Sequence, residues 1–226
     1  MDEAQAQDFS AMRSRMADDV DAMYAETRSE TGLASMSPAV RAALGKVERH
    51  RLVPAARAAD AYRNYPLPIG NGQTISQPYI VALSTDLLGL KGGEKVLDVG
   101  TGSGYQAAVL AEIASQVFSI ELIPSLANEA RKRLEELGYG NIEISIGDGY
   151  AGWPEKAPFD AIVVTAAAPR LPQALLDQLK PGGRMVIPVG GNGDIQYLKL
   201  ITKRADGGYD EKKVLPVRFV PLVPGK

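Results

Sequence analysis

Short apolar segments alternate with helix-length segments from residue 95 onward, and this alternation restricts the fold more than any other feature of the sequence. The pattern predicts strands at residues 96–99, 117–120, 142–146, 160–165 and 185–189. It predicts helices between them at residues 106–115, 124–137 and 173–179. Strands joined by helices form an α/β fold, a mostly parallel and doubly wound sheet with helices on both faces. Two strands that look antiparallel, 196–202 and 214–220, follow around a turn at 206–208.

The first ninety residues have a different pattern, which predicts a helical layer. An apolar stripe at spacings of three and four places five side chains on one helix face; they are Phe9, Met12, Met16, Val20 and Met23. This stripe is expected to pack, either on the chain's own core or on a second subunit. Ser37 and Pro38 have the residue types of an N-cap and a first helical position, so a second helix is expected there.

Composition excludes several classes of site. The chain has no cysteine and one histidine, His50, so it has no disulfide framework, thiolate nucleophile, or metal site built from cysteines or several histidines. The formal net charge of −2 gives no electrostatic signature of a nucleic acid or membrane partner. The start, residues 1–5, is acidic and polar, unlike a signal peptide, and no apolar run approaches the roughly 18 residues of a membrane span. A cytoplasmic protein without a metal is expected.

A glycine-rich turn, Gly100-Thr101-Gly102-Ser103-Gly104, directly follows the first predicted strand and opens a helix. Glycine allows the sharp turn and the close approach of a ligand, although a purely structural turn uses it too. Glu121 ends the next strand, where an acidic side chain can accept hydrogen bonds from both hydroxyls of a ribose. The third glycine comes one residue earlier than in the dinucleotide fingerprint, which favours an adenosine ligand without a pyrophosphate.

Asp148 lies between Gly147 and Gly149, directly after the third strand. Alone it would be read as a solvated turn, but the carboxyl ends of strands are where open α/β sheets bind ligands, and an aspartate there can accept from an adenine amino group. The glycine turn, Glu121 and Asp148 together predict an S-adenosylmethionine site of the Rossmann-like, class I methyltransferase type. A carboxylate acceptor is already ionised at neutral pH and needs no general base. One histidine and no cysteine fit such an acceptor, although other side chains remain available as bases.

Six stretches of the sequence carry a resemblance to a known family. They are LPIGNGQTISQPY (67–79), VLDVGTGSGYQAAVLA (96–111), VFSIE (117–121), GDGYAGWPEKAPFDAIVVTAA (147–167), LKPGGRMVIPVG (179–190) and VLPVRFVPL (214–222). In them the chain resembles the protein-L-isoaspartate (D-aspartate) O-methyltransferases. The loop at 74–76 is more specific to this family than the glycine turn is, because that turn occurs across unrelated methyltransferases.

The resemblance implies an enzyme that transfers methyl from S-adenosylmethionine to the α-carboxylate of L-isoaspartyl residues in damaged proteins, and in many members to D-aspartyl side chains. The ester then closes to a succinimide without the enzyme. It also implies a single domain over residues 1–226, with a helical layer and active-site loop at 1–90 and a cofactor-binding core at 91–226.

The resemblance also assigns site residues by position. Ser76 is the active-site hydroxyl between methyl donor and acceptor. Val220 and Leu222 belong to the segment that docks the substrate backbone. The remaining positions are assigned to the cofactor; they are Thr74, Ile75, Gly100, Gly102, Gly104, Glu121, Asp148 and Gly149.

Several readings stay open from the sequence alone. Ser76 suits a hydrogen-bond donor to the acceptor carboxylate better than a covalent nucleophile, but at the entry of a helix it is equally suited to be a cap. Glu48 and Asn64 depart from the proline and aspartate that are common in the family, which puts acceptor preference in question. His50 is expected to be structural or on the surface, and Trp153 to belong to the core.

Two alternative functions remain at this point. One is a related enzyme with a small-molecule acceptor. The other is a recognition module that binds S-adenosylmethionine and a peptide with little turnover.

Overall fold

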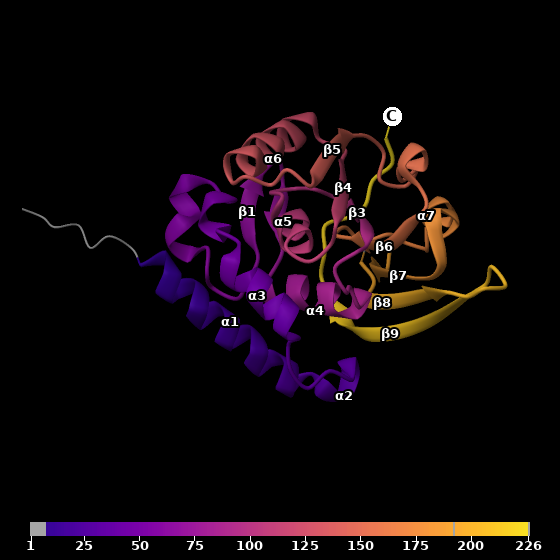
Figure 1. The fold of residues 1–226 in the computed structure, drawn as a ribbon, viewed down its shortest axis with the longest axis horizontal. Helices are drawn as coiled ribbons and strands as arrows, with labels where there is room; N and C mark the ends of the chain where they lie inside the picture. Colours follow the sequence, from indigo (N-terminus) through magenta and orange to yellow (C-terminus); the bar gives the residue numbers. More distant parts are fainter. Residues whose placement is uncertain (1–7, 192, 226) are drawn as a thin grey trace, which may run out of the picture.

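The described part of the computed structural model, residues 8–191 and 193–225, is built around a seven-stranded sheet of order β5-β4-β3-β6-β7-β8-β9 (Figure 1). Residues 1–5, whose acidic and polar sequence is unlike a signal peptide, lie outside the described residues. The strands are β3 (Lys95–Val99), β4 (Gln116–Glu121), β5 (Ile142–Ile146), β6 (Phe159–Val164), β7 (Leu179–Val189), β8 (Gln196–Lys203) and β9 (Tyr209–Val217). Pairing from β5 through β7 is parallel, and β8 and β9 add to the sheet antiparallel, as the sequence predicts.

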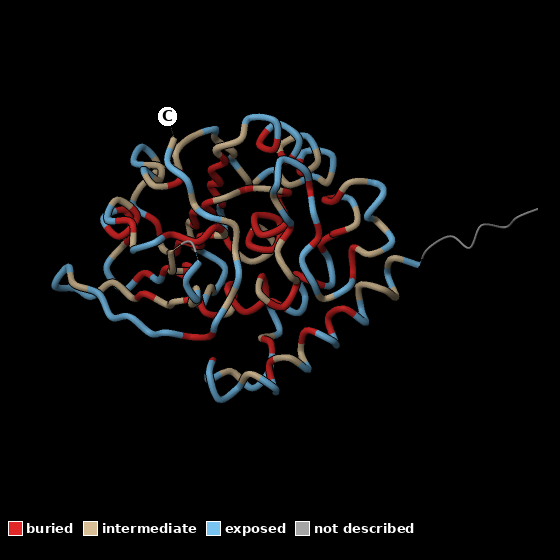
Figure 2. Tube along the Cα trace, turned by 180° about the vertical axis from the view of Figure 1, so that it is seen from behind, coloured by how far each residue is buried: buried red, intermediate tan, exposed pale blue. Residues whose placement is uncertain are grey.

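Each face of the sheet has its own apolar core, because successive residues of a strand point to opposite faces. Val96 packs with the helices of one face, and its neighbour Leu97 packs with those of the other. The first face carries α4 (Pro78–Leu88), α5 (Tyr105–Ala111) and α6 (Pro124–Glu136). The second carries α7 (Gln173–Gln178) and the short η3 (Pro154–Lys156), where Trp153 packs edge-on against Phe118. Figure 2 shows the buried segments gathered in the sheet and its helices, and the tip of the β8–β9 hairpin exposed.

The N-terminal layer lies over the first face. It consists of α1 (Phe9–Glu26), α2 (Arg28–Thr31), α3 (Pro38–Lys46), η1 (Arg49–Arg51) and η2 (Ala55–Asp60). Within the predicted stripe of α1, Met16 and Val20 are fully buried in the same core cluster as residues of α4 and α5. The stripe therefore packs on the chain's own core. Ser37 caps α3 as predicted, since its Oγ accepts from the Val40 amide at 3.3 Å.

The interior of this layer contains a buried cation. Arg49 is fully buried, and its Nε donates to the Ala61 carbonyl at 2.7 Å while its guanidinium lies 4.5 Å from the centre of the Tyr105 ring. Beside it, the ring of His50 stacks on Phe9 and its Nδ1 lies 2.8 Å from the Tyr62 hydroxyl. Both residues hold the layer together, which agrees with the structural role expected for His50.

Three predicted elements differ from the structure by more than one residue at a boundary, and backbone pairing explains the main difference in each. The helix expected at 106–115 ends at Ala111, because the amides of Ser115 and Gln116 turn to the Glu94 carbonyl and start β4. The strand expected at 185–189 begins at Leu179, because a bulge opposite β6 absorbs the Pro-Gly-Gly segment at 181–183. The strand expected at 214–220 occupies Tyr209–Val217.

Beyond Val217 the chain leaves the sheet because other partners take its backbone. Gln196 binds both polar groups of Phe219, accepting from its amide at 2.6 Å and donating to its carbonyl at 3.2 Å. Ala167 then donates to the Val220 carbonyl and accepts from the Leu222 amide. These bonds carry residues 218–222 across the carboxyl ends of the parallel strands.

The segment at 67–79, expected as a shaped loop, forms a hairpin. Its strands are β1 (Leu67–Gly70) and β2 (Gln73–Ile75), joined by Asn71 and Gly72, which both have positive φ. Asn-Gly is the sequence most favoured in such two-residue hairpin turns, so this signal was present in the sequence.

Candidate active site

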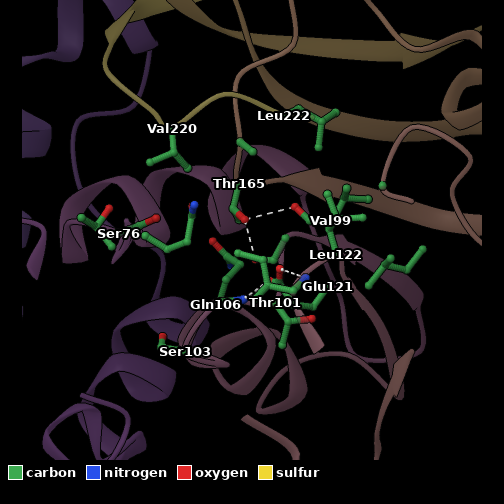
Figure 3. A pocket seen from close by; sticks show the side chains of 18 of the residues that line it. Ser76, Val99, Thr101, Ser103, Gln106, Glu121, Leu122, Thr165, Val220 and Leu222 are labelled. Carbon is green, nitrogen blue, oxygen red and sulfur yellow. Dashed lines mark hydrogen bonds between the residues drawn. The ribbon is translucent and has the colours of Figure 1, made fainter. Parts of the chain in front are cut away.

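The carboxyl ends of β3, β4 and β6 enclose a cleft of about 810 Å³, counting the space open to solvent, which we call the central cleft (Figure 3). The glycine turn forms one side of it and the β1–β2 hairpin another. The segment at 220–223 lies across it. In the view of Figure 3, Ser76 and Leu122 lie on opposite sides, with Thr165 between them.

Glu121 is held firmly at the edge of this cleft. Its Oε2 accepts from the Gly102 amide at 2.8 Å, and its Oε1 accepts from the Ile123 amide at 2.9 Å. The side chain is buried, so these two bonds fix the orientation of the carboxylate. Each carboxylate oxygen has a second lone-pair site, so Glu121 can still accept two hydrogen bonds from a ligand.

Thr165, which follows β6, holds the other side of the glycine turn. Its Oγ1 lies 2.7 Å from the Gly100 carbonyl oxygen and 3.1 Å from that of Val99, and its hydroxyl donates to this pair. A Cβ on Gly100 would come within 2.5 Å of the same Oγ1. The hydroxyl of Thr165 therefore occupies the space that a side chain at position 100 would need.

Packing, more than ligand approach, requires glycine at two other predicted positions. A Cβ on Gly104 would lie 2.9 Å from Leu134 Cδ1, and one on Gly149 would lie 2.7 Å from Val99 Cγ1. Gly102 differs in its surroundings, because a Cβ there would have its nearest side-chain neighbour at an ordinary 3.5 Å. With φ at +52°, Gly102 is glycine for its backbone conformation alone, and it lines the cleft.

A buried polar chain lies beneath the turn. Ser119 donates to Asp98 Oδ2 at 2.7 Å, and its Oγ lies 2.6 Å from the Thr101 hydroxyl. Burial raises the pKa of Asp98 to about 7; the bond from Ser119 opposes this and the charge of Glu121 adds to it. Oδ1 of Asp98 makes no hydrogen bond within the described residues. A carboxyl group with this pKa is partly protonated near neutrality.

Ser76 lies between β2 and α4 and is half-buried. It does not cap α4, because Gln77 occupies the N-cap position and the Tyr79 amide is bound at 3.0 Å by Oδ1 of Asn64. The Nδ2 of Asn64 also donates to Met23 Sδ at 3.0 Å. The hydroxyl of Ser76 remains available to a ligand.

A second hollow, the side groove, opens next to the central cleft. Thr74, Ser76, Thr165 and Val220 line both. One wall of the groove comes from α1 and α2, and the other from the end of β9 and the residues after it. Apolar side chains dominate its surface; among them are Met23, Pro66, Ile80, Val217 and Phe219.

The structure brings most of the predicted site residues to the central cleft. Its lining contains nine of them: Thr74, Ile75, Ser76, Gly100, Gly102, Glu121, Gly149, Val220 and Leu222. Gly104 and Asp148 do not line it. Asp148 instead accepts from the Tyr150 amide at 2.8 Å, and its side chain lies beside Gly225. Leu222, predicted with the substrate segment, lines the cleft and not the side groove.

Sequence reasoning missed several lining residues. Leu122 and Ile123 directly follow Glu121, and Thr165 directly follows β6. All three lie at carboxyl ends of parallel strands, so the rule that selected Asp148 applies equally to them. Gln106, on the first turn of α5, carries no such signal, since it is buried in an alanine-rich segment.

Comparison with known proteins agrees with this geometry. The model of the family "Protein-L-isoaspartate(D-aspartate) O-methyltransferase (PCMT)" matches residues 21–226. The chain belongs to this family. Protein-L-isoaspartate O-methyltransferase 2 of Polaromonas sp. (strain JS666) is 56% identical over 207 residues, which are 92% of this chain and 98% of that protein.

Solved structures of family members share the fold. One protein-L-isoaspartate O-methyltransferase superimposes with a TM-score of 0.77 at 28% identity; the match covers 92% of this chain and 65% of that longer one. A candidate member from Plasmodium falciparum, in complex with S-adenosyl-L-homocysteine, gives a TM-score of 0.74 at 25% identity over 93% of this chain and 98% of its own. The chain therefore has the class I, Rossmann-like α/β methyltransferase fold that its sequence predicts.

The groups facing the central cleft fit S-adenosylmethionine. The fixed carboxylate of Glu121 offers two acceptor sites, which match the two adjacent hydroxyls of a ribose. Apolar side chains such as Val99, Ile120 and Leu122 provide surface for an adenine ring. Among the residues that the structure describes, no cluster of three or more histidine, aspartate or glutamate side chains is placed to hold a metal ion. Of the helices in the same residues, none has the length and apolarity needed to cross a membrane.

Proposed function

We propose that this protein transfers a methyl group from S-adenosylmethionine to the α-carboxylate of L-isoaspartyl residues, and to the side-chain carboxylate of D-aspartyl residues, in damaged proteins and peptides. The observation that carries the proposal is the position of Ser76. Its hydroxyl, which does not cap α4, lies where the cleft that contains the Glu121 carboxylate meets the groove with a mostly apolar surface. Family membership supports the same activity.

The chain's own residues supply orientation and water exclusion. When bound, S-adenosylmethionine supplies an electrophilic methyl group. Glu121 and the glycine turn hold the donor, and Thr74 and Ile75 cover it from the hairpin. Ser76 donates a hydrogen bond to one oxygen of the acceptor carboxylate, which directs the other oxygen toward the junction. The apolar side groove removes water from that carboxylate, which makes it a better nucleophile.

No general base is needed for this acceptor. An α-carboxyl group has a pKa well below 7, so at neutral pH it enters the site as a carboxylate with a nucleophilic lone pair. After release, the methyl ester is attacked by the amide nitrogen of the following residue of the substrate. Methanol leaves and the succinimide forms, and its hydrolysis returns some normal aspartate.

A three-substrate assay tests the proposal. Donor labelled in its methyl group is offered with a short isoaspartyl peptide, with its aspartyl twin and with a metabolite extract. We expect a base-labile methyl ester on the isoaspartyl peptide alone. A labelled small molecule would instead identify a small-molecule methyltransferase. Donor binding without any product would identify a recognition module.

A further inference from the structure

The side groove contains two charged side chains in a lining that is otherwise uncharged and mostly apolar. They are Glu30, on α2, and Arg218, which directly follows β9. Both are exposed, and neither forms an ion pair within the described residues. Five other arginines differ in this respect, since they have carboxylate partners within 4 Å: Arg41, Arg51, Arg63, Arg133 and Arg204. The charge of Arg218 is therefore available to a ligand in the groove.

The backbone around Arg218 is fixed on both sides. Val217 pairs with Gln196 in the β8–β9 ladder. Phe219, on the other side, is bound through both of its backbone polar groups by the Gln196 side chain. The Cα of Arg218 is thus held in place, and only its side chain adjusts.

The opposite wall is tied to the same strand. Lys212 Nζ, on β9, donates to the Thr31 carbonyl at the end of α2 at 2.9 Å. This bond links the helix that carries Glu30 to the strand that leads to Arg218, so the backbones that carry the two charges are tied together. A peptide in the groove meets a positive side chain on one wall and a negative side chain on the other.

We propose that Arg218 and Glu30 select acceptors by charge, so that the groove favours isoaspartyl segments with an acidic side chain next to Arg218 and disfavours a basic one there. This inference rests on the proposed function and specifies its substrate class. Both groups are exposed and screened by solvent, so each is expected to change KM by about two- to five-fold. The value of kcat should not change, since neither side chain lies at the junction of groove and cleft.

The test uses isoaspartyl peptides of one length with Glu, Gln or Lys placed one to three residues on either side of the damaged site. For wild-type protein we expect the Lys peptide to have a higher KM than the Glu peptide on one side of the site, with the difference shrinking between 50 and 300 mM KCl. Arg218→Glu should invert that ratio, Arg218→Lys should keep it and Arg218→Gln should abolish it. Glu30→Lys should alter the ratio on the other side.

Arg57→Gln serves as the matched control, because Arg57 is exposed on η2, does not line the groove and loses the same charge. Equal KM ratios in wild-type protein and Arg218→Gln, or an equal change in Arg57→Gln, would overturn the charge selection. The Gln peptide separates this from the proposed function. If all proteins methylate it, the activity stands whatever the ratios are; if none does, the proposed function fails.

Discussion

The central cleft and the side groove share four residues but are built on different principles. In the cleft and just beneath it, several polar groups are already engaged with protein: Glu121 with two amides, Thr165 with two carbonyls, Ser119 with Asp98 and Thr101. In the groove, the surface is mostly apolar, and Glu30 and Arg218 have no ion-pair partner within the described residues. A site for one constant ligand can have its hydrogen-bonding groups oriented before binding. A site for many different peptides is better served by a surface with few directional hydrogen-bonding groups, because such a surface accepts different side chains.

Removing Glu121 should have the largest effect and should damage the cleft alone. Glu121→Ala leaves the partly buried amides of Gly102 and Ile123 without a partner, at up to about 1–3 kcal/mol each, and removes the proposed ribose acceptor. We expect the affinity for S-adenosylhomocysteine, measured by titration calorimetry, to fall about 100-fold or more. Arg57→Gln should bind like wild type. Loss of less than about three-fold would show that the turn is organised by other contacts.

Ser76→Ala should lower the rate of methyl transfer and leave the ligand affinity of the cleft nearly unchanged, whereas Glu121→Ala lowers that affinity. It removes one hydrogen bond to a charged acceptor, about 1.5–3 kcal/mol, so kcat should fall about ten- to 100-fold. Affinity for S-adenosylhomocysteine should stay within about two-fold, because no side-chain contact of Ser76 supports the turn. Initial rates and calorimetry together check this, and Ser76→Thr, which keeps a hydroxyl, provides the control. An equal loss of rate and affinity would place Ser76 in donor binding instead.

The buried carboxyl group of Asp98, beneath the cleft, should make the free energy of unfolding depend on pH. Its pKa in the folded protein, about 7, lies above the ordinary aspartate value, so between about pH 4 and pH 7 the folded state binds a proton that the unfolded state lacks. Stability from this group is greatest at low pH and is lost as pH rises toward 7, by up to about 1.4 kcal/mol per unit.

Asp98→Asn removes this titration. Urea unfolding at pH 5.5, 6.5 and 7.5 should show a weaker decrease in the free energy of unfolding for Asp98→Asn than for wild type. Identical pH dependence in the two proteins would mean that Asp98 stays ionised in the fold.

Thr165→Val should give the smallest of these effects. It tests a residue that lines both the cleft and the groove. The change keeps the shape and removes the hydroxyl that holds the Gly100 carbonyl, about 0.5–1.5 kcal/mol. S-adenosylhomocysteine affinity should fall about two- to ten-fold, and Thr165→Ser should restore it. If valine and serine bind equally, the hydroxyl does not hold the turn.

The comparison also explains what the sequence could predict. The positions of the strands, the glycine turn and Glu121 follow from local patterns, because the cleft is made by residues at the ends of strands. The groove depends on residues far apart, such as Met23 and Val217, and no local pattern connects them. Gln196 shows the same limit: its capture of Phe219, which ends β9 early, is a long-range side-chain contact that periodicity does not contain.

The bond between Lys212 and the Thr31 carbonyl has a consequence for how the molecule comes into being. The two walls of the groove come from residues near opposite ends of the sequence, and Lys212 joins them through the Thr31 carbonyl. During synthesis, the residues of the cleft that end β3, β4 and β6 are therefore made before the strand that leads to the second wall. A chain that ended before residue 212 would lack both this wall of the groove and the segment at 220–223 that lies across the cleft, so the last strand completes both hollows at once.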